Sequence, residues 1–240
     1  MKKLFIDCGH NSSICDTGSS GFGLKEHDVA YRVGVILAEK LKNVGFTVYL
    51  SHKNSWEVLG TTTTSSLAER VDKANMLGVD YYISLHTDGS PSPYAKGAHV
   101  RIYDSKSPAK PLAEAIINEM LRTLPLYGRD EIIKEDASLY VLRRTTMPSL
   151  LVEMGFITNK ENADLMKTPN KLVEAIFTGI CTHFNIDLNP ELISVKDIVD
   201  AFVKIGIIED KELWLTKLSE DTGAYWLARK TINYILKKGV

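Results

Sequence analysis

The segment Val79-Asp-Tyr-Tyr-Ile-Ser-Leu85, which runs directly into His86, decides the fold class of this 240-residue chain. A nearly continuous apolar strand of this kind is typical of a sheet that is covered on both faces. Outward from it, short strands and amphipathic helices are predicted in alternation, with strands at 3–7, 46–51, 98–103 and 149–154 and helices at 25–43, 67–77, 111–124 and 171–184. This alternation predicts an α/β domain with a mainly parallel or mixed central sheet flanked by helices.

Local signals refine this outline. The Gly- and Ser-rich stretch 8–24 is predicted to be a loop, and Ser66-x-x-Glu69 has the form of a capping box for the second helix. Residues 139–142 are predicted to form a further short strand. After Asp187-Leu-Asn-Pro190 the pattern becomes helical, with expected helices at 195–205, 210–218 and 224–237. We therefore expect an α/β domain at 1–187 and a small all-helical module at 188–240.

The composition excludes several classes of protein. Lys and Arg number 29 against 30 Asp and Glu, so there is no basic field to hold nucleic acid or an anionic membrane. No apolar run approaches the ~20 residues that cross a bilayer, so membrane insertion is not expected. Met1-Lys-Lys-Leu-Phe-Ile-Asp7 lacks the apolar core of a signal peptide, which predicts synthesis in the cytoplasm without the usual secretory export. Three cysteines without a CxxC pair predict reduced thiols.

Four polar residues follow predicted strands or begin the next helix. His10 follows the first strand, Glu26 lies in the first turn of the first helix, His86 ends the decisive strand, and Glu153 follows the apolar run 149–152. Ligands of open α/β sheets bind outside the carboxyl ends of the strands, so these side chains are expected to converge. Two imidazoles and a carboxylate suit a catalytic zinc with one open position, and a second carboxylate can accept the proton of an attacking water.

Each of these residues also has an ordinary structural explanation. A histidine at a strand end is more often a hydrogen-bonded surface residue than a ligand. Glu26 could compensate the dipole at a helix start. Glu153 is the most informative of the four, because a charge after an apolar run is costly unless something pairs with it.

The chain resembles the zinc-dependent N-acetylmuramoyl-L-alanine amidases of the amidase-3 family, including their phage endolysins, from about residue 2 to residue 186. Several separate motifs occur in the family's order: Phe5-Ile-Asp-Cys-Gly-His10, Gly21-Phe-Gly-Leu-Lys-Glu26, Leu67-Ala-Glu-Arg70 with Ala74-Asn75, Ile83-Ser-Leu-His86, Gly97, Val141-Leu-Arg143 and Pro148-Ser-Leu-Leu-Val-Glu-Met-Gly-Phe-Ile-Thr-Asn159. The resemblance implies that His10, Glu26 and His86 hold one zinc ion and that Glu153 is the catalytic carboxylate. It also implies hydrolysis of the amide between N-acetylmuramic acid and L-alanine of peptidoglycan.

The sequence departs from the family pattern at three places near the implied site. Cys8 replaces a proline; a packed thiol is preferred here to a metal ligand. Asn11 replaces the glycine that commonly follows the histidine, so the shape of the following loop is not implied by the resemblance. Thr87-Asp88 replaces Ala-Asn, so Asp88 is a candidate substrate-binding residue that can only accept hydrogen bonds.

Two more residues are candidates for binding substrate. Trp56 could stack on a sugar ring or anchor its own loop. Arg143 could pair with a carboxylate of the stem peptide or form a structural salt bridge.

The expected biological role is that of an endolysin, made without a signal peptide and acting on the bacterial cell wall after release. The alternatives are another zinc hydrolase of peptidoglycan, such as a carboxypeptidase or deacetylase, and a non-catalytic wall-binding protein with structural zinc. The neutral C-terminal module is expected to target the wall or to form a homo-oligomer.

Overall fold

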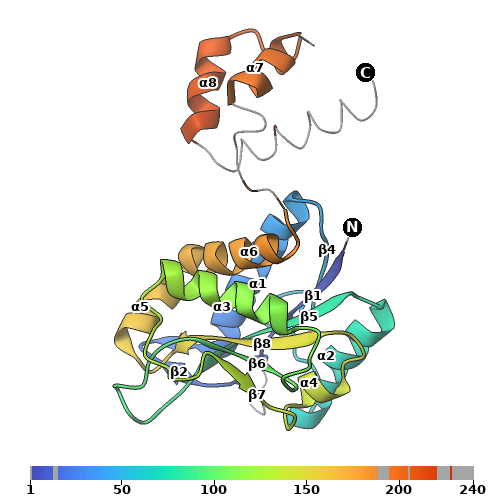
Figure 1. Ribbon diagram of the computed structural model, residues 1–240, viewed down its shortest axis with the longest axis vertical. Helices are drawn as coiled ribbons and strands as arrows, with labels where there is room; N and C mark the ends of the chain where they lie inside the picture. Colours follow the sequence, from blue (N-terminus) through green and yellow to red (C-terminus); the bar gives the residue numbers. More distant parts are fainter. Residues whose placement is uncertain are drawn as a thin grey trace. The chain divides into compact units, whose positions relative to one another are not determined.

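The computed structural model describes residues 2–12, 16–186, 188, 195–204, 206–220 and 228. The chain divides into two compact units, residues 1–186 and residues 187–240. The first unit holds the sheet and the helices that cover it (Figure 1).

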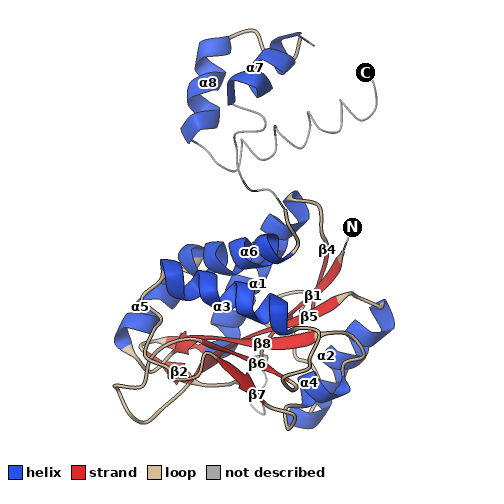
Figure 2. Ribbon diagram, viewed as in Figure 1, coloured by secondary structure: helices blue, strands red, loops and turns tan. Residues whose placement is uncertain are grey.

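A six-stranded sheet organises the described part of the first unit (Figure 2). The strands lie in the order β4 (Thr47–Leu50), β1 (Lys3–Cys8), β5 (Tyr81–Asp88), β8 (Ser149–Phe156), β6 (His99–Ile102) and β7 (Ile133–Glu135). All neighbours are parallel except β6 and β8, which run antiparallel. The predicted mainly parallel or mixed sheet is therefore confirmed.

Helices cover both faces of the sheet. On one face lie α1 (Glu26–Asn43), α3 (Lys110–Thr123) and α6 (Asn170–His183), and on the other lie α2 (Thr63–Leu77) and α4 (Tyr140–Arg144) (Figure 1). The short helix α5 (Lys160–Lys167) connects β8 to α6. Val33, Leu37 and Leu41 of α1 are fully buried, as their helical spacing predicts. Burial on both faces explains why the central strands are almost continuously apolar.

The face covered by α2 and α4 also has an apolar core beneath its polar edge. Phe5 and Tyr82, from neighbouring strands, stack with their ring centroids 5.3 Å apart. Val71 of α2, Val141 of α4 and Leu151 of β8 join them in one buried cluster. Side chains at the ends of the strands on this face are therefore positioned by a well-packed apolar core.

Two local predictions were wrong. Residues 139–142 do not form a strand but lead into α4, because Leu142 and Arg143 donate their backbone amides to the Leu139 carbonyl. A four-residue apolar run fits one side of a helical turn as well as it fits a strand. The second helix begins at Thr63 rather than after Ser66, since its capping box joins Thr62 to Ser65.

The predicted loop 8–24 contains a small hairpin that the sequence analysis missed. Its strands are β2 (Ser20–Gly21) and β3 (Leu24–Lys25), joined by Phe22 and Gly23 with φ values of 50° and 78°. Two successive positive φ angles are typical of the tight turns that join antiparallel strands. The short strand β7 and the helix α5 were also not predicted.

The second unit contains α7 (Val195–Lys204) and α8 (Lys211–Glu220). Ile198, Val199 and Leu218 are buried, whereas Ile207 and Leu213 are exposed. The predicted helix at 224–237 and the break at 187–190 fall almost entirely outside the described residues. Within the described ranges, every helix is too short or too polar to reach across a bilayer.

Candidate metal centre

The four side chains singled out in the sequence come together at the carboxyl edge of the sheet. His10 follows β1, His86 lies near the end of β5, and Glu26 opens α1. Glu153 of β8 is the register partner of His86, so the two side chains share a face of the sheet. Residues up to 143 positions apart in the chain thus meet at one place.

His10, Glu26 and His86 present three ligand atoms within 4.8 Å of one another. Glu26 Oε1 lies 3.3 Å from His10 Nε2 and 3.1 Å from His86 Nδ1. Tetrahedral zinc with ligands at about 2.0–2.1 Å holds neighbouring ligand atoms about 3.3 Å apart. The donor set and its spacing therefore fit a zinc ion with three protein ligands.

The carboxylate of Glu26 is fixed by backbone amides as well as by the imidazoles. Thr87 N donates to Oε1 at 2.9 Å and Ser19 N donates to Oε2 at 2.7 Å. Burial opposes the charge of Glu26, but its hydrogen bonds to His10 and His86 outweigh that effect and hold its pKa well below the ordinary value. Glu26 is therefore an anion whose carboxylate lies between the His10 and His86 rings.

His10 is oriented by Asp16, a residue that the sequence analysis did not single out. Asp16 Oδ1 accepts a hydrogen bond from His10 Nδ1 at 2.8 Å, which leaves Nε2 facing Glu26. Burial disfavours the imidazolium, but Asp16 and Glu26 outweigh it and raise the pKa of His10 to about 9. Two carboxylates around one imidazole make this a place where positive charge is stabilised.

The backbone beneath the ligands is tightly packed. His10 itself adopts a φ of 63°, in the left-handed region that few side chains other than Asn, Asp and His enter. A Cβ on Gly9 would meet the His86 ring at 2.4 Å, and one on Gly18 would meet Glu26 Oε2 at 2.6 Å. Glycine at these positions lets the chain pass directly against the candidate ligands.

The buried ion pair between Arg70 and Asp7 lies next to Asp16. Arg70 of α2 donates to both oxygens of Asp7, at 3.2 and 2.9 Å, and its other terminal nitrogen lies 3.5 Å from Asp16 Oδ2. Ser84 donates to Asp7 at 2.6 Å. Burial disfavours the Asp7 anion, but Arg70 and Ser84 lower its pKa to about 2. Arg70, from the quoted motif 67–70, thus connects the metal centre to the sheet.

Glu153 is buried beside this centre and its Oε2 has no hydrogen-bond partner among the described residues. Burial, with the neighbouring carboxylates of Asp88 and Glu26, raises the pKa of Glu153 to about 8. The closest cation is Arg101, whose Nε lies 3.9 Å from Glu153 Oε1. A carboxyl group with a pKa near neutrality can both accept and return a proton.

The three predicted substrate-binding residues lie in different surroundings. Asp88, at the end of β5, accepts a hydrogen bond from Arg129 and lies 3.4 Å from His99 Nδ1. Trp56 is 74% exposed, and its carbonyl accepts a hydrogen bond from Ser12, two residues after His10. Arg143 donates to the carbonyls of Ala137 and Ser138, so part of its guanidinium group holds that loop.

The departures from the family pattern find structural explanations. The sulfur of Cys8 is buried against α1, where a Cβ on Gly34 would come within 2.5 Å of it. Cys8 therefore packs among apolar groups. Asn11 donates to the Leu59 carbonyl at 3.1 Å and to Ser66 at 2.9 Å, which ties the loop after His10 to the start of α2.

Arg101 and Arg129 were also not identified from the sequence. Arg101 follows His99 by two positions in an otherwise apolar strand, and this polar alternation was the available signal. Arg129 lies in a segment without periodicity, and its guanidinium group stacks 4.5 Å from the centroid of the Phe156 ring. Nothing in the sequence around Arg129 indicates that contact.

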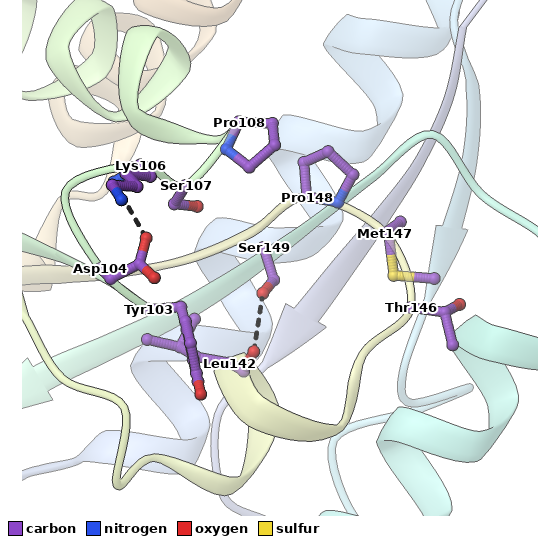
Figure 3. A pocket seen from close by; sticks show the side chains of 10 residues that line it. All are labelled: Tyr103, Asp104, Lys106, Ser107, Pro108, Leu142, Thr146, Met147, Pro148 and Ser149. Atoms are coloured by element: carbon purple, nitrogen blue, oxygen red, sulfur yellow. Dashed lines mark hydrogen bonds between the residues drawn. The ribbon is translucent and has the colours of Figure 1, made fainter.

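A separate cavity of about 340 Å³ lies at the opposite edge of the sheet (Figure 3). It is lined by residues that follow β6 and residues that precede or begin β8, among them Tyr103, Asp104, Pro148 and Ser149. Ser149 donates to the Leu142 carbonyl at 3.5 Å. This cavity contains no member of the metal centre.

Comparison with known proteins agrees with the motifs. The family model of N-acetylmuramoyl-L-alanine amidases matches residues 4–182. The amidase CwlM of Bacillus licheniformis is 30% identical over 79% of this chain and 71% of its own length. An endolysin of Bacillus phage SPP1 is 27% identical over 77% of this chain and 67% of its own length. The solved structure of the amidase AmiC2 of Nostoc punctiforme, 28% identical, superimposes with a TM-score of 0.66 over 77% of this chain and 97% of its own.

Proposed function

The chain belongs to the N-acetylmuramoyl-L-alanine amidase family, and from this premise we propose that His10, Glu26 and His86 hold one zinc ion while Glu153 transfers the proton. The protein is a peptidoglycan hydrolase that cleaves the amide between N-acetylmuramic acid and L-alanine of the stem peptide. The observation that carries the zinc proposal is the position of Glu26 Oε1, 3.3 Å from one imidazole nitrogen and 3.1 Å from another.

When bound, a zinc ion supplies a Lewis acid that polarises the amide carbonyl and lowers the pKa of a coordinated water. His10 and His86 contribute neutral nitrogen ligands, and Glu26 contributes the anionic one. Asp16 fixes the His10 ring so that Nε2 remains available as a ligand. Three protein ligands is the number that catalytic rather than structural zinc sites use, so this donor set would leave a place for water or substrate.

Glu153 performs the proton transfer in this proposal. As a carboxylate it accepts a proton from the attacking water, and as a carboxylic acid it delivers that proton to the departing alanine nitrogen. An amide needs this second step, because an unprotonated amine is a poor leaving group. The pKa of about 8, which burial and neighbouring carboxylates give Glu153, suits both halves of the cycle.

Replacing Glu153 with glutamine tests the assignment. Glu153→Gln keeps the shape of the side chain but removes its proton transfer, so we expect turnover of purified peptidoglycan to fall by about 10²–10⁴-fold. Zinc content, measured by atomic emission, should stay near one ion per chain. The matched control is Glu135→Gln, since Glu135 is an exposed acid on β7.

Two outcomes would contradict the assignment. Full activity in Glu153→Gln would remove Glu153 from the reaction. Loss of zinc from that variant would instead make Glu153 a ligand. The released amine, identified by mass spectrometry as a peptide with N-terminal alanine, checks the cleaved bond at the same time.

We also propose that Trp56, Asp88 and Arg143 bind substrate. Trp56 is supported by its exposure on a loop hydrogen-bonded to Ser12, beside the metal centre. Asp88 already accepts from Arg129, so its contact with substrate uses its remaining lone pairs. For Arg143 the contact uses the donors that do not hold residues 137 and 138. Kinetics of Trp56→Ala, Asp88→Asn and Arg143→Lys on soluble muropeptides test each role through KM.

The biological role that we propose is that of an endolysin whose C-terminal unit targets the wall or joins copies of the chain. Exposed apolar side chains in that unit, among them Ile207, Leu213 and Trp214, support a binding surface. Full-length Glu153→Gln should sediment with purified cell walls, and the added change Trp214→Ala should weaken this. If sedimentation is unchanged while the molar mass in solution falls, the surface serves self-association.

A further inference from the structure

Buried polar atoms without hydrogen-bond partners gather beside Glu153. Among the described side chains they include Nε of Arg101, Nε of Arg129, both ring nitrogens of His99 and Oε2 of Glu153. Native proteins pair nearly all buried polar groups with protein, water or ligand. A concentration of unpaired polar atoms at one place indicates a surface whose partners come from outside the chain.

The sheet register brings these groups onto one face. His99 of β6 is the register partner of Glu153, and Arg101, two residues further along β6, therefore points to the same side. Arg101 Nε lies 3.9 Å from Glu153 Oε1, and Lys134 of β7 is the register partner of Arg101. Arg101 and Lys134 thus lie on the β6 and β7 side of Glu153, and the charge of Arg129, which pairs with Asp88, acts on the same His99 ring.

The charges of this cluster are only partly balanced. Arg101 pairs with Asp136 at 2.8 Å, and Arg129 pairs with Asp88. Lys134 has no ion pair with any described carboxylate, although its charge acts on both Asp88 and His99. Burial, with smaller contributions from the charges of Arg129, Arg101 and Lys134, lowers the pKa of His99 to about 3.

The unpaired groups of Arg101, Arg129 and Lys134 are all donors. Arginine and lysine side chains have no acceptor, so their complement is an anion rich in oxygen. Both arginines remain partly open to solvent, with 27% and 21% of their side chains exposed. A planar carboxylate fits the fork of a guanidinium group, and ligand can reach these groups from solution.

The proton transfer proposed for Glu153 indicates which half of the substrate lies beside Arg101, Arg129 and Lys134. The proposed ligands come from β1, β5 and α1, whereas Glu153 comes from β8, the next strand toward β6 and β7. Glu153 hands its proton to the amine nitrogen, so the amine half of the substrate extends past Glu153 over β6 and β7. The sugar half then extends the other way, toward β4 and Trp56.

We propose that Arg101, Arg129 and Lys134 bind a carboxylate of the stem peptide on the amine side of the cleaved bond. This inference rests on the proposed function of Glu153. An extended peptide advances about 3.5 Å per residue, so the carboxylate on the residue after alanine comes within reach of Arg101 when the amide nitrogen contacts Glu153. These residues therefore select substrates whose second residue bears a free carboxylate.

The test compares two soluble substrates. One is N-acetylmuramoyl-L-alanyl-D-glutamate, and the other is the same compound with both glutamate carboxylates converted to amides. Wild-type protein should cleave the free acid with a KM about tenfold lower, because a charge-assisted contact is worth about 1.4 kcal/mol or more. The kcat values for the two substrates should agree within about threefold, since the chemical step is the same.

Lys134→Gln, Arg101→Gln and Arg129→Gln should raise KM for the free acid about tenfold and leave KM for the diamide nearly unchanged. Lys134→Gln is the mildest variant, because Lys134 has no ion pair with any described carboxylate. The control is Lys106→Gln, an exposed lysine beside the cavity at the opposite edge of the sheet. Thermal unfolding of each variant establishes that it is folded.

Equal KM values for the two substrates in wild-type protein would overturn the inference. An equal rise in KM for both substrates in all three variants would also overturn it, since that indicates a general disturbance. Failure of the proposed function has a different signature: wild-type protein would release no peptide with N-terminal alanine from either substrate, or Glu153→Gln would remain active.

Discussion

His10 Nδ1 lies 2.8 Å from Asp16 Oδ1, so the ring nitrogen that does not face Glu26 is already held by a carboxylate. The hydrogen bond fixes the tautomer and the rotation of the ring, and it makes Nε2 a more basic ligand. Asp16 is in turn held by Ser66 and lies close to Arg70. The orientation of one proposed ligand is thus set by α2, which contributes no ligand itself.

Asp16→Ala should therefore weaken zinc binding by about 10–100-fold, the usual effect of removing a hydrogen-bond partner of a metal-bound histidine. Competition with a chromogenic chelator measures the affinity directly. Asp104→Ala is the control, because Asp104 lies beside the cavity at the opposite edge of the sheet. Identical zinc affinities for the two variants would mean that Asp16 does not position His10.

Arg70→Met should lower the free energy of unfolding by about 3–5 kcal/mol, because it leaves the fully buried Asp7 without its cation. Urea denaturation measures the change. Arg122→Met is the matched control: Arg122 pairs with Glu119 on the surface of α3, where solvent screens the ion pair and its loss should change the stability little. Equal losses in the two variants would contradict a structural role for the buried pair.

Acid should destabilise the protein through Asp7. Its pKa is about 2 in the folded protein and near 3.8 in an unfolded chain, so the folded state binds this proton less readily. The stabilisation is complete above about pH 4 and is lost as the pH falls toward 2. Unfolding free energies measured between pH 5 and pH 2 should fall more steeply for wild-type protein than for the double variant Asp7→Asn/Arg70→Met.

The α/β fold and the converging site residues could be predicted because both depend on local rules. An apolar strand with a polar residue at its carboxyl end puts that residue at the ligand-binding edge, wherever the strand lies in the sheet. This rule applies to His10, His86 and Glu153 alike. Their convergence needed no knowledge of the loops.

Asp16 and Arg129 could not be predicted in the same way, because their positions depend on tertiary contacts of loops. Asp16 lies six residues after His10 in a stretch without periodicity, and Arg129 reaches Asp88 across 41 residues. The helix at 140–144 was missed for a related reason: a short apolar run fits either a strand or a helical turn, and packing against α2 decides between them.

Gly18 and Gly23 allow the effect of backbone strain to be measured apart from crowding of the proposed metal ligands. Both have positive φ angles, 70° and 78°. A Cβ on Gly18 would come within 2.6 Å of Glu26 Oε2 and of His10 Cδ2, whereas a Cβ on Gly23 would meet nothing within 4 Å. Alanine at either position costs about 1–2 kcal/mol of backbone strain, because an L-residue disfavours the left-handed region.

Gly18→Ala should therefore lose zinc affinity and amidase activity, while Gly23→Ala should lose only stability. Thermal unfolding should show a decrease for both variants because of the backbone strain, and a larger one for Gly18→Ala because its Cβ also meets Glu26 and His10. Chelator competition should distinguish them, because only the Gly18 variant moves Glu26 and His10 apart. Unchanged zinc affinity in Gly18→Ala would mean that the ligands tolerate the displacement, and the close contact beneath them would then have no part in holding the metal.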